Sequence, residues 1–431
     1  MTDLLTQIRL SNGLLIQLKE IHTAPIISQW VWYRVGSRNE IPGKTGISHW
    51  VEHMQFKGTP TFPARILDKA ITREGGFWNA FTYLDWTTFF ETMPSEKIDL
   101  ALRLEADRMF NSRYDPEEVE SERTVIISER EGSENEPLFR LSEAVQTASF
   151  DLHPYRHEVI GEKQDLLNIS REDLYQHYQD NYHPGNAVIA LAGDFNTKSM
   201  LVRLEEIYAD FPAATITNNF QINQEIPLTE ERQVEITGPG QTTFLSLAYR
   251  SPAASHPDFF AYTVLDSLLT GPSSLNMFGG GISNKTSRLY RALVEGEFAI
   301  SVYGSLPATI DPYLYNINIT VHPHQIPQAV LQIVETEISR LQDVPVSMDE
   351  IQRAVKQTRA LFAYGSENIT NQAFWLGYAE MFDHYEWFQT FVERVEAVTP
   401  ADIQRVARAY LTPNQRVVGT YLPTGNGKDS E

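Results

Sequence analysis

The feature that most constrains the fold is a segment of about twenty residues that occurs twice. Residues 169–188 and 398–417 align without a gap. In both, a capping residue opens a predicted helix, a proline turn follows, and a hydrophobic strand comes next. The shared aspartate and the shared proline are displaced by the same 229 residues (Asp173 and Asp402, Pro184 and Pro413). The repetition predicts a chain built from two similar domains.

The beginnings of the two halves also resemble each other. Trp32-Tyr33-Arg34, within a strand predicted from Ile26 to Val35, resembles Ala248-Tyr249-Arg250 near the start of the second half. Between the halves lies a polar stretch with little periodicity, which is typical of a linker. A chain of 431 residues is long for a single core. We therefore expect an N-terminal domain over residues 1–213, a linker over 214–230 and a homologous C-terminal domain over 231–431.

Only the first half contains a motif with obvious chemistry, His49-Trp-Val-Glu-His53. On a helix, His49, Glu52 and His53 share one face, because they lie at positions i, i+3 and i+4. Two imidazoles on one face can bind one metal ion, with the glutamate close to a bound water. The order inverts the commoner His-Glu-x-x-His motif. A surface helix with two histidines and an acid is the alternative, and the motif alone does not decide between them.

A third metal ligand would have to be a carboxylate or another histidine, because the chain has no cysteine. The predicted helix over 115–133 carries Glu122 and Glu129, which are two turns apart on one face. We expect Val125 and Ile126 to bury the adjacent stripe, so that the carboxylates point inward. A solvated acidic helix would show the same pattern, since further glutamates lie nearby.

Composition and charge exclude some classes of partner. The chain is 42% hydrophobic and 21% charged, as in soluble globular proteins, and its net charge is −21. Such a chain should repel nucleic acid and anionic membranes, so we expect neither as a partner. The charge fits either a solvated acidic surface or an acidic chamber that attracts basic peptides. Residues 1–9 lack a signal-peptide pattern and no run of about 20 apolar residues occurs, so we expect a cytoplasmic protein without a membrane span.

The motif and its surroundings resemble the pitrilysin, insulin-degrading enzyme and mitochondrial processing peptidase family. His53 is followed 76 residues later by Glu129, in the pattern Glu-Arg-x-Val-Ile-x-x-Glu that begins at Glu122. Three further segments are similar to the family and span most of the chain. They are Gly75-Gly-Phe-Trp-Asn79-Ala80-Phe81-Thr82, His153-Pro-Tyr155 and Thr286-Ser-Arg-Leu-Tyr290.

The resemblance implies an α+β fold of two homologous α/β sandwich domains. Each would have a mostly antiparallel sheet plus helices, and together they would form one half of a clam shell. The implied activity is that of a zinc-dependent endopeptidase, an inverzincin, which hydrolyses unfolded or oligopeptide substrates in a closed chamber. A non-catalytic binding or scaffold subunit of a peptidase complex is the main alternative, and a metallohydrolase of another kind, such as an amidase, is a further one.

The resemblance also implies roles for individual residues. His49, His53 and Glu129 would bind Zn²⁺, and Glu52 would be the general base and then the general acid. Glu122 would be the second catalytic residue beside Glu52, with the role of orienting a ligand histidine. Three residues would serve the peptide substrate. Asn79 and Ala80 would belong to an edge strand to which a peptide adds by backbone hydrogen bonds, with Phe81 beside them.

One departure from the family concerns the second half. The family has an Arg and a Tyr seven residues apart that bind substrate and stabilise the oxyanion. The aligned positions here hold Val294 and Ile300, and Arg291 to Phe298 has the spacing without the hydroxyl. The resemblance then implies the metal-bearing subunit of a two-subunit enzyme of the bacterial processing-peptidase-like type. We expect a dimer, preferentially a heterodimer with a homologous subunit that carries the Arg/Tyr pair.

Two other features have no assigned role. The glycine-rich stretch Gly271–Gly281 lacks the Gly-Lys-Ser/Thr of a phosphate-binding loop, so we expect a surface loop there. His322 and His324 have no acidic partner that would suggest a metal site, and we expect isolated surface histidines.

Overall fold

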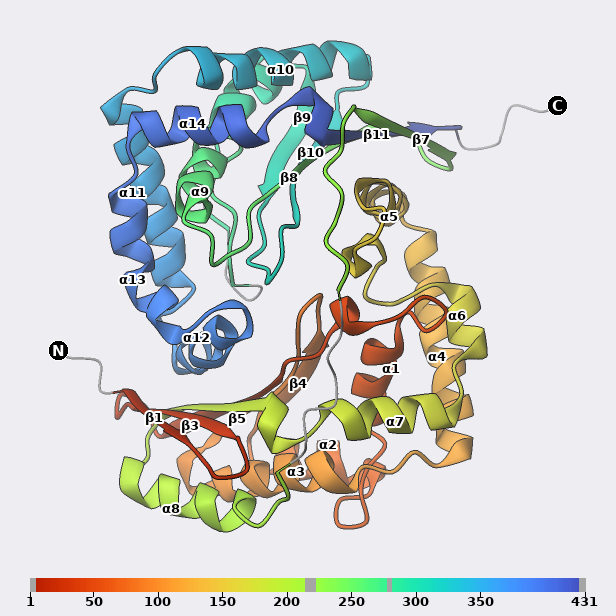
Figure 1. Ribbon diagram of the computed structural model, residues 1–431, viewed down its shortest axis with the longest axis vertical. Coiled ribbons are helices and arrows are strands. Elements are labelled where there is room, and N and C mark those ends of the chain that lie inside the picture. The colour runs from red at the N-terminus through yellow and green to blue at the C-terminus, as the bar shows by residue number, and fades with distance from the viewer. Residues whose placement is uncertain (1–4, 214–221, 277–280, 426–431) are drawn as a thin grey trace. The chain divides into compact units, whose positions relative to one another are not determined.

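The computed structural model describes residues 5–213, 222–276 and 281–425, which form an α+β fold with two sheets (Figure 1). The first sheet has the strand order β1-β2-β6-β3-β5-β4. In the part of the chain that the structure describes, β2–β6 is the one parallel pair of this sheet, which is thus mostly antiparallel, as predicted. Its strands are β1 (Leu5–Arg9), β2 (Leu15–Glu20), β3 (Ile26–Tyr33), β4 (Phe77–Thr82), β5 (Thr87–Pro94) and β6 (Ala187–Gly193).

The second sheet repeats the arrangement of the first without a counterpart of the edge strand β1. Its order is β7-β11-β8-β10-β9, and among the described strands β7–β11 is its one parallel pair. The strands are β7 (Arg232–Gly238), β8 (Phe244–Arg250), β9 (Ala299–Ser305), β10 (Leu314–Val321) and β11 (Arg416–Pro423). β6 begins at residue 187 and β11 at residue 416, the offset of 229 found in the sequence. The predicted duplication is therefore present in the topology of the sheets.

Helices cover both sheets. In the first half of the chain they are α1 (Ile47–Met54), α2 (Ala64–Arg73), α3 (Ile98–Asn111), α4 (Pro116–Glu134), α5 (Pro137–Ser149), α6 (Lys163–Asn168), α7 (Arg171–Asn181) and α8 (Thr197–Tyr208). In the second half they are α9 (Asp258–Leu269), α10 (Pro327–Asp343), α11 (Met348–Tyr364), α12 (Ile369–Phe382), α13 (Tyr385–Glu396) and α14 (Pro400–Tyr410). Residues 259–269 of α9 are all buried, because α9 lies between the second sheet and the helices α11 and α14 (Figure 1).

The repeated segment begins with the same capping structure in both copies. In α7 the Ser170 hydroxyl accepts from the Asp173 backbone N–H, and the Asp173 carboxylate accepts from the Ser170 N–H. Thr399 and Asp402 form the same capping box at α14. These reciprocal bonds satisfy two otherwise free N–H groups at each helix start.

The two compact units of the structure do not coincide with the two halves of the chain. One unit comprises residues 1–130, 157–222 and 367–385, and the other comprises 131–156, 223–366 and 386–431. As a result α12, from the second half, packs on β3 and β6 of the first sheet, whereas α5, from the first half, packs on β7, β8 and β11. The continuous domains 1–213 and 231–431 expected from the sequence do not include this exchange, because an apolar helix face does not specify which sheet it covers.

The face of α12 is fitted to the first sheet by aromatic packing. The Phe374 ring lies 5.3 Å from that of Trp30 and 5.4 Å from that of Trp32, both in edge-on geometry. At Gly377 a Cβ atom would lie 2.1 Å from Trp32 Nε1, so the helix approaches closely only because this residue is glycine. Large buried aromatic side chains dominate core energetics, which makes α12 an integral part of this unit.

Part of the expected linker 214–230 lies outside the described residues, since the structure does not describe 214–221. Beyond that gap, Glu225 accepts hydrogen bonds from the backbone N–H groups of Asp151, Leu152 and His153, at 2.9, 3.0 and 2.7 Å. The second part of the expected linker is thus anchored to its own unit. Within the described ranges, no helix combines the length and the apolar character needed to cross a membrane.

Candidate metal centre

The helix α1 carries the inverted motif and is fixed at its first turn. Gly46, which precedes it, has a φ of 85°, and a Cβ atom there would lie 2.4 Å from the Ile160 carbonyl oxygen. The Glu40 carboxylate accepts from the N–H groups of Gly46 and Ser48, at 2.8 and 2.9 Å. A carboxylate at this end is favoured because the first N–H groups of a helix have no partner within it. Trp50, Val51 and Met54 are buried in the core, which directs the motif to the other face.

Three predicted ligands come together. Ligand atoms of His49, His53 and Glu129 all lie within 4.8 Å of one another. The Nε2 atoms of His49 and His53 are 3.2 Å apart, and His53 Nε2 is 3.7 Å from Glu129 Oε2. Two nitrogen ligands on one tetrahedral zinc ion, with bonds of about 2.0–2.1 Å, would be separated by about 3.4 Å. Two imidazoles and a carboxylate are also a donor set typical of catalytic zinc sites, in which water takes the fourth position, so the residues fit this ion.

His49 has the environment of a neutral ligand. Burial lowers the pKa of His49 to about 3, with a further contribution from the neighbouring His53. Its Nδ1 atom is buried and makes no hydrogen bond within the part of the chain that the structure describes. The ring is therefore neutral at neutral pH, and a neutral imidazole is the form that binds metals.

His53 is oriented by a chain of charged groups. Its Nδ1 atom lies 2.8 Å from Glu122 Oε1. Burial lowers the pKa of His53, but the Glu122 bond and the surrounding carboxylates outweigh burial and bring it above the ordinary value. The other oxygen of Glu122 forms an ion pair with Lys57, which follows the C-terminal end of α1. Glu122 thus contacts Nδ1 of His53, whereas Nε2 of the same ring is the atom near the other candidate ligands.

Glu52 occupies a nearly dry position beside the ligands. It is 8% exposed, and burial raises its pKa to about 7. The Thr82 hydroxyl, at the end of β4, donates a hydrogen bond of 3.3 Å to Glu52 Oε2. A carboxyl group with a pKa near neutrality can both accept and return a proton, which general acid–base chemistry needs.

The predicted peptide-binding residues lie on an edge strand. β4 is the outermost strand of the first sheet and pairs with β5, where Asn79, Ala80 and Phe81 are opposite Phe90, Phe89 and Thr88. Asn79 is exposed, Ala80 is buried and Phe81 is partly buried. The Ala80 N–H donates to Asn79 Oδ1 at 2.9 Å. Because α1 packs on β4, this edge lies next to the helix that carries the motif.

The prediction for the stripe beside the glutamates was half right. Ile126 is fully buried, but Val125 is 47% exposed. At 100° per residue, Val119 and Ile126 lie on one side of Glu122, whereas Val125 lies on the other. The buried stripe is therefore centred away from Val125, and Glu122 and the half-exposed Glu129 stand at its edge.

Two functional candidates were missed from the sequence. Lys57 stands four residues after His53 but beyond the end of α1 at Met54, so the helical period does not place it near the motif. Thr82 belongs to the Asn-Ala-x-Thr pattern, but nothing in the pattern shows that its hydroxyl reaches Glu52. Both contacts depend on how α1, α4 and β4 pack together.

The second unit shows what replaces the Arg/Tyr pair. Val294 ends a short π-helical turn, η5 (Tyr290–Val294), and Ile300 lies on β9 with 54% of its surface exposed. Arg288 is held by Glu350 through two hydrogen bonds of 2.7 and 3.0 Å.

His322 and His324 belong to no cluster of three potential metal ligands in the described ranges. Residues 277–280 of the Gly271–Gly281 stretch lie outside those ranges.

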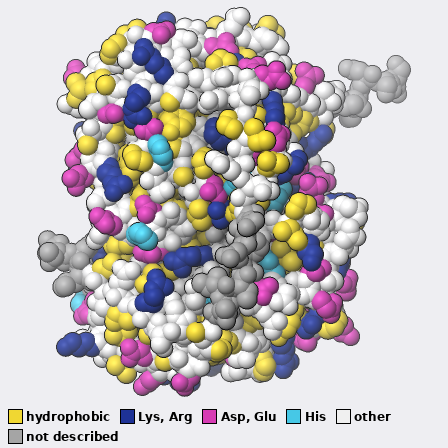
Figure 2. Space-filling model, in the orientation of Figure 1, with side chains coloured by type: hydrophobic (Ala, Val, Ile, Leu, Met, Phe, Trp, Pro, Cys, Tyr) yellow, Lys and Arg dark blue, Asp and Glu magenta, His cyan; other side chains and the backbone are white. Residues whose placement is uncertain are grey.

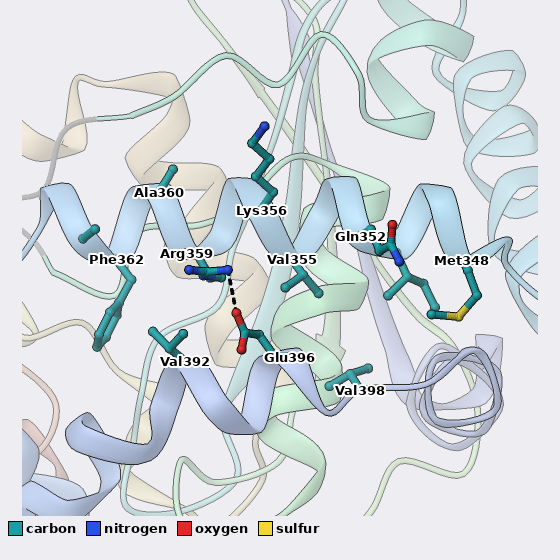
Figure 3. Close-up of a pocket in the computed structure, with 12 residues that line it drawn as sticks. Met348, Gln352, Val355, Lys356, Arg359, Ala360, Phe362, Val392, Glu396 and Val398 are labelled. Atoms are coloured by element: carbon teal, nitrogen blue, oxygen red, sulfur yellow. Dashed lines mark ion pairs between the residues drawn. The ribbon is translucent and has the colours of Figure 1, made fainter.

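The second unit also contains a groove of about 720 Å³ between α11 and α13. Figure 3 shows its apolar side chains, which include Val355, Val392 and Val398, and the ion pair of 2.6 Å between Arg359 and Glu396 that joins the two helices. None of its lining residues belongs to the predicted site.

On the face shown in Figure 2, Asp and Glu side chains are dispersed among Lys and Arg, as on a solvated acidic surface.

Two family models match consecutive parts of the chain. Residues 15–163 match the insulinase model of peptidase family M16, and residues 168–358 match the model described as the peptidase M16 inactive domain. The chain belongs to peptidase family M16. In this M16 chain the inverted motif, Glu122 and Glu129 all lie within the first match, and the segment that matches the inactive domain is the one without the motif.

Relatives of this M16 chain extend over almost its whole length. A Bacillus subtilis protein named uncharacterized zinc protease YmxG is 26% identical over 420 residues, which are 96% of this chain and 97% of the relative. The mitochondrial-processing peptidase subunit beta of Lentinula edodes is 25% identical over 411 residues, or 93% of this chain and 86% of that protein. These relatives belong to the family that the sequence motifs indicated.

Solved structures confirm the fold of this M16 chain. A protease from Helicobacter pylori superposes with a TM-score of 0.89 at 24% identity, covering 97% of this chain and 99% of that one. A peptidase M16 inactive domain from Pseudomonas fluorescens gives 0.85 at 18% identity, with coverages of 99% and 100%. At these identities the likeness concerns the fold alone.

Proposed function

We propose that the protein is a zinc-dependent endopeptidase that cleaves unfolded or oligopeptide chains. The observation that carries the proposal is the convergence of His49, His53 and Glu129 beside the buried carboxyl of Glu52. The ligand set fits zinc, and several relatives are named zinc proteases. A subunit that only bound peptides would need neither the ligands nor the adjacent base.

The roles of the side chains follow from their positions. A zinc ion held by His49, His53 and Glu129 would supply Lewis-acid chemistry, which activates water and polarises a peptide carbonyl. Glu52 accepts the proton of the attacking water and then donates it to the leaving amine, which suits its raised pKa. Thr82 holds Glu52 in place, and Glu122 holds the ring of His53.

The edge strand β4 offers the peptide a place to bind. A substrate that adds to Asn79 and Ala80 would be held through main-chain hydrogen bonds, which demand little of its sequence. Such binding selects extended chains, because most main-chain groups within a folded protein are already hydrogen-bonded. Phe81 would line the adjoining surface.

The decisive variant is Glu52→Gln, which keeps the size of the side chain and removes the base. We expect cleavage of a quenched fluorescent peptide to fall by about 10²–10⁴-fold, with about one zinc per chain retained in metal analysis. Glu118→Gln changes an exposed glutamate of α4 and should leave both quantities unchanged. Full activity of Glu52→Gln would refute the proposed base.

We also propose that full activity needs a partner subunit. Support comes from the second unit, where Val294 and Ile300 stand at the positions of the Arg/Tyr pair, and from the relatives named processing peptidase subunit beta. The same peptide assay should show weak cleavage by this chain alone and strong cleavage after addition of a homologous chain that carries the pair. High activity of the isolated chain would contradict the pairing but not the endopeptidase.

A non-catalytic role in a peptidase complex is the second candidate. The second family model and the similar Pseudomonas fluorescens structure are both described as a peptidase M16 inactive domain. Metal analysis together with the peptide assay separates the two functions. A purified complex that contains this chain, lacks zinc and does not cleave peptides would favour the non-catalytic role.

A further inference from the structure

Lys57 is linked to the candidate metal centre through Glu122. Its ammonium group forms an ion pair with Glu122 Oε2, while Glu122 Oε1 lies 2.8 Å from His53 Nδ1. The Lys57 side chain is 24% exposed and that of Glu122 is 7% exposed. A single, nearly buried carboxylate therefore joins the cation to the ring that would bind the metal.

Lys57 is also the cation that pairs with the carboxylates of the site. Three of them, Glu52, Glu122 and Glu129, lie around His53. In the described ranges, Lys57 is the one Lys or Arg in an ion pair with any of these three carboxylates. A buried carboxylate left without a cation is costly, so loss of Lys57 would disturb Glu122 first.

We propose that Lys57 is a positioning residue for zinc binding, an inference that rests on the proposed function of the site. Lys57 holds the Glu122 carboxyl group in register with His53. Glu122 then accepts a hydrogen bond from the Nδ1–H of His53. This bond fixes the tautomer that carries its proton on Nδ1. The Nε2 atom, which lies near His49 and Glu129, thereby keeps its lone pair for the metal. Carboxylates that hold the second nitrogen of a metal-binding histidine commonly affect metal affinity by 10–100-fold.

The test measures zinc affinity of the full chain by competition with a chromophoric chelator at constant pH. Lys57→Met keeps the length of the stem and removes the charge, and it should weaken zinc binding about 10–100-fold. Lys57→Arg retains the charge and should bind more tightly than Lys57→Met. Urea unfolding of the metal-free proteins checks that each variant is folded, and Lys57→Gln replaces Lys57→Met if the latter is not.

A double variant shows whether Lys57 acts through Glu122. Glu122→Gln alone should weaken zinc binding, and adding Lys57→Met to it should cause little further loss, because both changes break the same link. Zinc affinity of Lys57→Met equal to the wild type, or losses that add fully in the double variant, would overturn the inference. A wild-type chain that does not bind zinc would instead refute the proposed function itself.

Discussion

His177 shows how a residue outside the ligand set supports the helix that carries the motif. It lies on α7, which packs on α1, and its Nε2 is 3.4 Å from the Ser48 hydroxyl. Burial lowers the pKa of His177 to about 4. The ordinary value for histidine, about 6.5, applies to the unfolded chain. The folded protein therefore resists a proton that the unfolded chain accepts.

The consequence is a dependence of stability on pH. The contribution of His177 is fully present above pH 6.5 and is lost as the pH falls from about 6.5 towards 4. Between pH 7.5 and 5 we expect His177 to account for a decrease of about 1–2 kcal/mol in the free energy of unfolding. Urea unfolding should show a smaller decrease for His177→Gln. His324→Gln, at an exposed histidine, should behave as the wild type, and equal decreases in all three proteins would contradict the assignment.

At this scale the sequence predicted most of what local geometry controls. The helical period placed His49, Glu52 and His53 on one face, and the structure has them there because α1 is a regular helix over Ile47–Met54. The helical spacing offered both Glu122 and Glu129 as a third ligand, and only the family resemblance selected Glu129. The contacts of Lys57 and Thr82 depend on the packing of three elements, which no periodicity encodes.

Among the elements, α12 depends most closely on a single residue. Its Gly377 faces the indole of Trp32 on β3, where a Cβ atom would lie 2.1 Å from Nε1. Alanine usually stabilises a helix relative to glycine by about 0.5–1 kcal/mol. Here the methyl group would push α12 away from the sheet.

We expect Gly377→Ala to lower the free energy of unfolding by about 1–3 kcal/mol, the usual effect of overpacking a core. The matched control is Gly132→Ala in α4, where no atom lies within 4 Å of the added Cβ. That change should raise stability by about 0.5–1 kcal/mol. Urea unfolding measures both, and a Gly377→Ala protein as stable as the wild type would show that α12 can shift without cost.

The capped helix, proline turn and strand of each repeated segment were accessible from the sequence, whereas the partners of α5 and α12 were not. The capping boxes at Ser170 and Thr399 are local, and a capping residue was correctly expected at the start of both helices. Which sheet a helix covers depends on contacts between residues that are far apart in the sequence. An apolar helix face is compatible with either sheet, so pattern alone leaves it undetermined.

On the scale of the whole molecule, the exchange of α5 and α12 makes each half of the chain depend on the other. Residues 1–213 contain the whole first sheet but not the helix that covers β3 and β6. Without α12 the fully buried Trp30 and Trp32 would lose aromatic neighbours on that face. Exposed aromatic surface of this kind favours aggregation.

A fragment of residues 1–213 should therefore unfold at lower urea concentration than the full chain, with a less cooperative transition. Fusing residues 367–385 to its end through a flexible linker should raise the midpoint, whereas a scrambled version of that segment should not. Circular dichroism follows both transitions. A lone fragment with the midpoint of the fused one would mean that α12 is dispensable to this unit.

The exchange also bears on how such a chain could have arisen. Adding the repeat offset of 229 to the bounds of α5 gives 366–378, which overlaps α12 (Ile369–Phe382). The exchanged helices are thus counterparts, each given by one repeat to the sheet of the other. Reciprocal transfer of one identical element is the hallmark of a domain-swapped homodimer. Duplication of an ancestral gene and fusion of its copies would turn a helix exchange between two molecules into an exchange between two repeats of one chain.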